Sequence, residues 1–185
     1  MSMTTNYKTN QCGFTIIESL VAISIMLVAI AGPLTLANNS ISNAVASKQQ
    51  LEASYLGQDL LEYIRWVRDT EGTSQFLGEV GSLCTVSDPC AVDTTKTTFT
   101  GPTGSDSALK GSCSDPSVCV LYYDKTGTHQ YGHDGTTGAT PTTFSRSLAI
   151  TRISSDEFTA TVVTAWKTPS GVRAVTLKED FMNWK

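Results

Sequence analysis

The chain has 185 residues, enough for one domain with a hydrophobic core and an additional segment. Its formal net charge is −4, from 13 basic and 17 acidic residues, and the basic residues form no cluster, so no nucleic-acid partner is expected. The sequence contains no P-loop, no dinucleotide-binding fingerprint and no Gly-x-Ser-x-Gly nucleophile motif. Composition and motifs therefore indicate neither an enzyme nor a bound cofactor.

The most informative stretch is an apolar run over residues 14–37, in which Glu18 is the only charged residue. As a helix this run is about 36 Å long, which is enough to cross a hydrocarbon core of about 30 Å. The free energy that its Phe, Ile, Leu and Val side chains contribute to membrane insertion is larger than the cost of inserting one carboxylate. We therefore predict a transmembrane helix over 14–37. The preceding residues 1–13 are polar and have no apolar core, unlike an ordinary signal peptide.

Glu18 has no basic partner nearby, because the closest cations in the sequence are Lys8 and Lys48. Its place near the helix start is favourable for an anion, since the helix dipole is positive there. A cut between Gly13 and Phe14 would add an α-amino group beside the apolar run. That amine could pair with Glu18 of the same chain or of a neighbouring chain. Helices packed side by side with a small axial offset would then form a self-complementary filament.

The residues Gly13-Phe14-Thr15-Ile16-Ile17-Glu18 resemble the cleavage and methylation signal of type IV pilins and type II secretion pseudopilins. This resemblance implies that a prepilin peptidase cuts after Gly13 and that Phe14 becomes the N-methylated first residue. It also implies that Glu18 guides assembly with other pilin or pseudopilin subunits on an inner-membrane assembly platform. The family usually has Lys or Arg close before the Gly, whereas Cys12 stands there in this chain.

A second possible cut lies at Thr35-Leu36-Ala37, which resembles a signal-peptidase site and would release a soluble protein beginning at Asn38. Against it, the apolar run is longer than the usual signal-peptide core of about 7–15 residues and carries an acid near its start.

Gly32 and Pro33 interrupt the run, and proline removes a backbone donor, so we predict a helix break there. Pilin-like helices often carry such a break.

Residues 38–71 are predicted to continue the helix in amphipathic form. Apolar side chains recur at spacings of three or four, at Ala53, Leu56, Leu60, Ile64 and Val67. Gly72 is a plausible end of the helix. The second half of the helix should therefore pack its apolar stripe on a sheet.

Residues 72–117 are rich in Gly, Ser, Thr and Asp and are predicted to form a loop region held by disulfides. Five residues that include a Ser-Asp-Pro turn separate Cys84 from Cys90, and the same is true of Cys113 and Cys119. Of the three possible connectivities of four cysteines, this pattern favours the local pairs Cys84–Cys90 and Cys113–Cys119. A four-thiolate zinc site is the alternative, although zinc motifs use tighter spacings. Four cysteines beyond the membrane run indicate an oxidising compartment, so we expect residues after the helix to lie outside the cytoplasmic membrane.

Residues 118–185 show strand patterns. Apolar residues alternate with polar ones over 144–151, 158–166 and 172–178, and a Pro-Ser turn joins the last two runs into a hairpin. Phe181 and Trp184 are candidates to anchor the C-terminus. A long helix followed by an antiparallel sheet predicts an α+β fold. The region is similar to a pilin headgroup, and its closing pattern resembles PilV-like minor pilins and I-type pseudopilins.

The two histidines, His129 and His133, lie among glycines, and Asp124 and Asp134 flank them. A weak cation site is one interpretation of this segment, and a solvated loop without a metal is the favoured one.

Three functions are compatible with the sequence: a minor pilin or pseudopilin, a membrane-anchored binding module that does not polymerise, and an anchored or secreted enzyme. The resemblance favours the first, as a membrane precursor that later enters a surface or periplasmic filament. It fits an adhesive pilus, a DNA-uptake pilus and a secretion pseudopilus equally.

Overall fold

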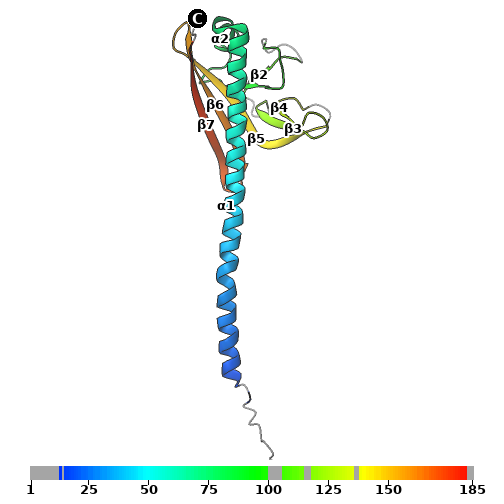
Figure 1. Ribbon diagram of the computed structural model, residues 1–185, viewed down its shortest axis with the longest axis vertical. Helices are drawn as coiled ribbons and strands as arrows, with labels where there is room; N and C mark the ends of the chain where they lie inside the picture. The colour runs from blue at the N-terminus through cyan, green and yellow to red at the C-terminus, as the bar shows by residue number, and fades with distance from the viewer. Residues whose placement is uncertain (1–12, 14, 100–105, 115–117, 136–137, 183–185) are drawn as a thin grey trace, which may run out of the picture. The chain divides into compact units, whose positions relative to one another are not determined.

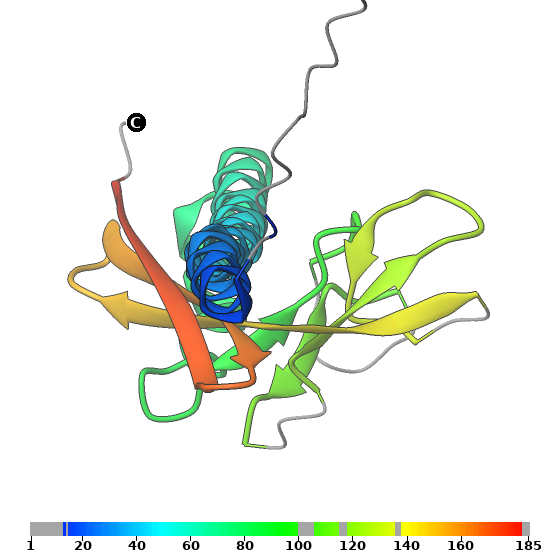
Figure 2. The same ribbon diagram turned by 90° about the horizontal axis from the view of Figure 1, so that it is seen from below.

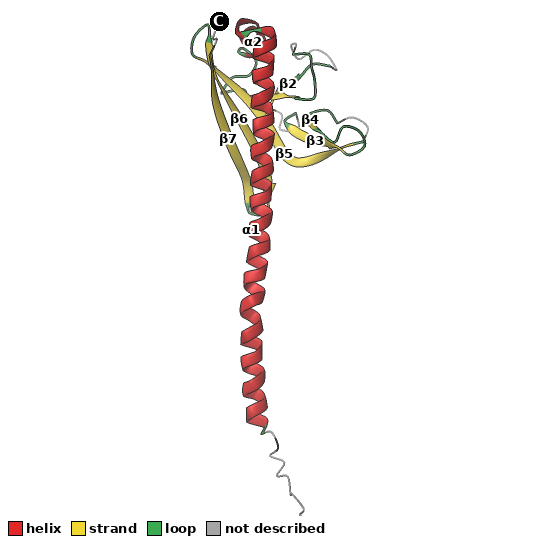
Figure 3. Cartoon of the chain, viewed as in Figure 1, coloured by secondary structure: helices red, strands yellow, loops and turns green. Residues whose placement is uncertain are grey.

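The computed structural model describes residues 13, 15–99, 106–114, 118–135 and 138–182 (Figure 1). Two helices come first, α1 (Ile16–Glu71) and α2 (Thr73–Val80). The strands follow: β1 (Cys90–Val92), β2 (Leu109–Ser112), β3 (Val120–Asp124), β4 (Tyr131–Gly132), β5 (Ala139–Arg152), β6 (Glu157–Thr168) and β7 (Gly171–Met182). The long helix and the antiparallel sheet confirm the predicted α+β layout (Figure 3). The chain divides into two compact units, residues 1–46 and 47–185.

The described part of the first unit is helical from Ile16 onward, and nearly all of its side chains are exposed. The helix continues without interruption through Gly32 and Pro33. The predicted break is therefore not present in this structure. Proline removes only one backbone donor, and one lost hydrogen bond is tolerated in membrane helices. A break that forms on assembly remains a prediction.

The second unit is built on a seven-stranded sheet in which β5 is the central strand. One edge of β5 pairs with β6 over Phe144–Arg152, and the other pairs with β3 and, further along, with β1. β7 pairs with β6 over its full length, and every one of these pairings is antiparallel. Thr168 lies opposite Gly171, which confirms the predicted hairpin, and Gly171 adopts a φ of 128° that favours glycine. The part of α1 in this unit packs on one face of the sheet, and Figure 2 shows the helix nearly end-on.

The face of the sheet toward α1 carries the period-two pattern expected from the sequence. The inward residues of β6 are buried: Phe158, Ala160, Val162, Thr164 and Trp166. The buried stripe of α1 contains the predicted Ala53, Leu56, Leu60, Ile64 and Val67. Gly57 permits a close approach between the layers, because a Cβ there would lie 2.8 Å from Leu177 Cδ1.

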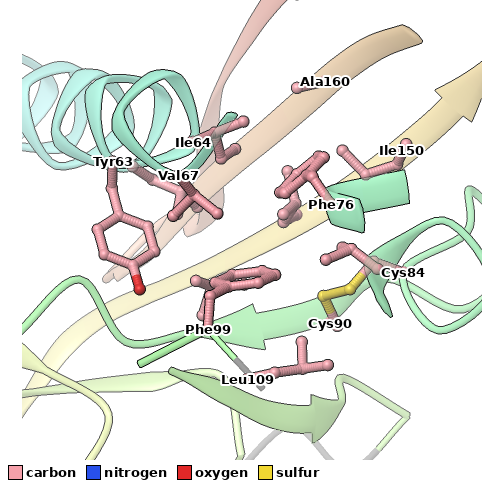
Figure 4. Packing of buried hydrophobic residues seen from close by; sticks show 14 of the residues in the cluster. Tyr63, Ile64, Val67, Phe76, Cys84, Cys90, Phe99, Leu109, Ile150 and Ala160 are labelled. Atoms are coloured by element: carbon pink, nitrogen blue, oxygen red, sulfur yellow. A yellow bond between two sulfur atoms is a disulfide. The ribbon is translucent and has the colours of Figure 1, made fainter. Parts of the chain in front are cut away.

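The described residues of the predicted 72–117 loop region include regular structure, namely α2, β1 and β2. Phe76 of α2 lies 5.0 Å from Phe158 and 5.5 Å from Phe99, measured between ring centroids (Figure 4). These elements are short and show no clear period, so tertiary packing and the disulfides, rather than local pattern, determine them. Phe181 is buried and stacks on Phe158, while Trp184 lies outside the described residues.

Candidate functional site

The predicted processing signal lies directly before the first turn of α1. The Thr15 carbonyl accepts hydrogen bonds from the backbone N–H groups of Glu18 (3.1 Å) and Ser19 (3.2 Å). The Thr15 hydroxyl also accepts from the Glu18 N–H, at 3.4 Å, so Thr15 and Glu18 have the order and spacing of a Thr-x-x-Glu capping box. A carboxylate at this place in the first turn favours helix initiation through the helix dipole, whatever its role in assembly. Gly13 is exposed, and Phe14 lies outside the described residues.

The apolar side chains of α1 within the first unit, residues 16–46, are almost all exposed in the described part of the chain. Ile16 is 84% exposed and Leu27 is 64% exposed, and the pattern extends along the rest of the first unit. Among the described residues, α1 is the one helix that is long and apolar enough to cross a membrane, judged by length and composition. An apolar surface of this extent requires a lipid or protein environment.

Comparison with known proteins identifies this segment. A family model described as the prokaryotic N-terminal methylation motif matches residues 8–32. The chain carries the type IV pilin and pseudopilin signature. The match covers the prepilin-type motif and residues 14–32 of the predicted transmembrane run 14–37, but not the unit formed by residues 47–185. Comparison with curated proteins and comparison with solved structures found no match.

The cysteines of the second unit form two disulfides, Cys84–Cys90 and Cys113–Cys119. This is the local pairing that the sequence spacing favoured. The first disulfide lies in the core and joins the segment after α2 to β1 (Figure 4). Because these four sulfurs are bonded in pairs, they do not form the alternative four-thiolate zinc site. No group of three or more His, Cys, Asp or Glu side chains that could hold a metal occurs among the described residues.

Arg146 of the second unit is fully buried, as is Asp93, and the sequence analysis did not single it out. Its Nη1 donates to the Leu56 carbonyl at 2.8 Å and to Asp59 Oδ2 at 2.9 Å. Its Nη2 donates to the Val92 carbonyl and the Thr94 hydroxyl, both at 3.3 Å. Burial lowers the pKa of Arg146, and the Asp59 carboxylate opposes this shift. Arg146 therefore ties α1, β5 and the segment after β1 together.

The two aspartates that flank the histidines have hydrogen-bond or ion-pair partners within the protein. The Asp124 carboxylate accepts three backbone hydrogen bonds, from residues 126, 127 and 128, and these hold its pKa below the usual range. Asp134 pairs with Lys96 Nζ at 3.0 Å and Lys110 Nζ at 2.8 Å. Both carboxylate oxygens of Asp134 are therefore paired with lysines. His129 is exposed, with a φ of 54°.

The expectation of a solvated loop was wrong for His133, which is 8% exposed. Its Nδ1 donates to the Val118 carbonyl at 3.2 Å, and its Nε2 is buried without a hydrogen-bond partner among the described residues. Its backbone N–H donates to Asp93 Oδ2 at 3.0 Å. Burial, followed by the neighbouring Arg146 guanidinium, lowers the pKa of His133 to about 4, while Asp93 acts in the opposite direction.

The lowered pKa of His133 predicts that the folded protein loses stability in acid. The unfolded chain binds a proton near pH 6.5 and the native protein only near pH 4, so stability is lost as the pH falls through this interval. We expect the free energy of unfolding to drop by about 2 kcal/mol between pH 7 and pH 5, a window above most carboxylate titrations. Urea unfolding at several pH values measures this. His133→Gln should flatten the dependence, while the matched variant of exposed His129, His129→Gln, should leave it unchanged. An unchanged slope in His133→Gln would contradict the assignment.

Proposed function

We propose that the protein is a minor pilin or pseudopilin, a structural subunit made as a membrane precursor. Prepilin peptidase removes residues 1–13 by cutting after Gly13, and Phe14 is then N-methylated. Residues 14–37 hold the precursor in the inner membrane with the 47–185 unit outside. Glu18 then directs assembly with other subunits, on the inner-membrane platform, into a pilus or secretion pseudopilus.

The observation that carries this proposal is the methylation motif at residues 8–32, placed at the start of an exposed apolar helix. The position of Gly13 supports it independently. A Cβ added at Gly13 would meet nothing within 4 Å, so packing does not require glycine there. A peptidase site that accepts only a small residue supplies the missing reason.

The two disulfides support a minor or tip-proximal position, because major pilins more often carry a single bridge near the C-terminus. The closing pattern of β6 and β7 supports kinship with PilV-like minor pilins and I-type pseudopilins. No specific observation favours an enzyme, and the alternative of an anchored module that does not polymerise makes a different prediction about the N-terminus.

The intact mass of the purified mature protein tests the proposal. We expect a loss of residues 1–13 and a gain of one methyl group, because cleavage exposes the Phe14 amine to the methylating enzyme. Gly13→Val is expected to retain the mass of the precursor. A wild-type protein that still begins at Met1 would support the anchored module instead, and one that begins at Asn38 would support signal-peptidase release.

A further inference from the structure

A groove of about 610 Å³ lies entirely within the 47–185 unit, between α1 and the segment that enters β4. Leu51, Tyr55 and Leu56 of α1 contribute its apolar lining, together with Tyr131 of β4. Tyr55 is 68% exposed, so its ring is available to a ligand. The volume and the mostly apolar lining with a few polar groups are those of a small-molecule site.

Hydrogen bonds fix both sides of this groove. The Tyr131 hydroxyl donates to Glu52 Oε1, and burial together with this bond raises the pKa of Tyr131, which keeps the hydroxyl a donor. On the other side of the groove, the Oδ2 of Asp59 accepts hydrogen bonds from Arg146 at 2.9 Å and from the Thr94 hydroxyl at 2.7 Å. The second oxygen of each carboxylate makes no hydrogen bond to another described residue. The groove is therefore preorganised and presents two acceptors to a ligand.

The spacing of these acceptors defines the shape of the ligand. Glu52 and Asp59 are seven residues apart on α1, which places them on one face and about 10 Å apart along the helix. Tyr55 and Leu56 lie between them and form an apolar floor. A ligand that fits has an apolar surface in the middle and hydroxyl donors on either side, over the length of two linked pyranose rings.

The charges of the groove are balanced, which disfavours an ionic ligand. Lys48 lies one helical turn from Glu52, and Arg146 forms an ion pair with Asp59. Two negative groups are thus matched by two positive groups, and neither a strongly basic peptide nor a polyanion is attracted by the local field. A neutral ligand that offers both C–H faces and hydroxyl groups is complementary to this surface.

We propose that this groove binds a neutral oligosaccharide segment, with a sugar C–H face on the Tyr55 and Tyr131 rings and sugar hydroxyls donating to the free oxygens of Glu52 and Asp59. Aromatic rings supply a large apolar contact with little loss of side-chain entropy, and hydroxyl bonds to ionised carboxylates are stronger than neutral ones. This binding role goes beyond filament assembly and does not depend on it.

Saturation-transfer NMR on the full-length protein tests the proposal, in a zwitterionic detergent that has no sugar headgroup. The probes are maltotriose, cellotriose and triacetylchitotriose, each at up to about 10 mM, because open grooves of this kind bind in the millimolar range. We expect at least one of the three to bind. Tyr55→Ala should weaken that binding about tenfold, since it removes the exposed ring of the platform.

Trp66→Ala is the matched control, because Trp66 is an exposed aromatic residue of α1 that does not line the groove. It should leave binding unchanged, and near-ultraviolet circular dichroism should show that both variants remain folded. Tyr131→Phe keeps the ring and removes the bond to Glu52, so a smaller loss is expected. No binding by any probe, an equal loss in the Tyr55 and Trp66 variants, or preferential binding of sialyllactose would overturn the proposal.

Discussion

Replacing Arg146 with methionine is expected to lower the free energy of unfolding of the 47–185 unit by about 3 kcal/mol or more. The guanidinium is fully buried and donates to four acceptors on α1 and on β1 and the segment after it. Methionine fills a similar volume but donates no hydrogen bond. The Val92 carbonyl then loses this donor in the interior, and Asp59 loses its ion-pair partner. The expected loss is large because one partner of a buried network is removed while the others remain.

Urea unfolding of the full-length protein in detergent, followed by tryptophan fluorescence, measures this loss, because Trp166 is buried in the same sheet. Arg152→Met is the matched control. Arg152 is also on β5 but is exposed and donates only to the nearby Ser154 carbonyl. Its replacement should change stability by less than about 0.5 kcal/mol. Equal effects of the two substitutions would show that Arg146 does not hold the three elements together.

The alternation of β5 already indicated that Arg146 points inward. Phe144, Leu148 and Ile150 were predicted to share one face, and residue 146 has the same parity. An arginine in that place contradicts the usual exposure of charged residues, and only the tertiary contacts with Asp59 and the β1 segment explain it. The same reasoning applies to His133, whose burial depends on Asp93 and Val118 from distant parts of the chain.

Local sequence patterns were sufficient to predict helices and strands where the patterns were long. The stripe of α1 and the strands β5, β6 and β7 follow from periods of 3.6 and 2 that extend over about seven residues or more. The 72–117 region has no such period, and its helix and two short strands depend on contacts with α1 and on the Cys84–Cys90 bridge. The groove beside β4 was likewise beyond sequence reasoning, because it combines side chains far apart in the chain.

The N-terminal signal is different, since its information is contiguous in the sequence. Gly13, Phe14 and Glu18 are recognised by order and spacing, and the fold of the second unit adds nothing to them. The structure adds one competing explanation for Glu18, its capping-box position with Thr15. An experiment on Glu18 must therefore separate its charge from its role at the start of the helix.

Glu18→Gln makes this separation. Glutamine retains the length and hydrogen-bonding capacity that a capping box requires, but it carries no charge to pair with the Phe14 amine. We expect the variant to insert normally, because removing the carboxylate favours insertion by about 2.5–3.5 kcal/mol at most. Incorporation into filaments is expected to fall at least tenfold, and Glu18→Ala should behave in the same way. The ratio of protein in sheared filaments to protein in the membrane fraction measures this.

Ser24→Ala is the control within the same apolar run, because the Ser24 hydroxyl donates only to the Leu20 carbonyl of its own helix, at 2.7 Å. It should assemble like the wild type. If Glu18→Gln assembles normally while Glu18→Ala does not, the carboxylate acts through helix capping and not through pairing with a neighbouring N-terminus. If both variants assemble normally, Glu18 has no role in assembly. A loss confined to filaments, with intact mass and methylation unchanged, leaves the exposed amine of a neighbouring subunit as the partner that the charge requires.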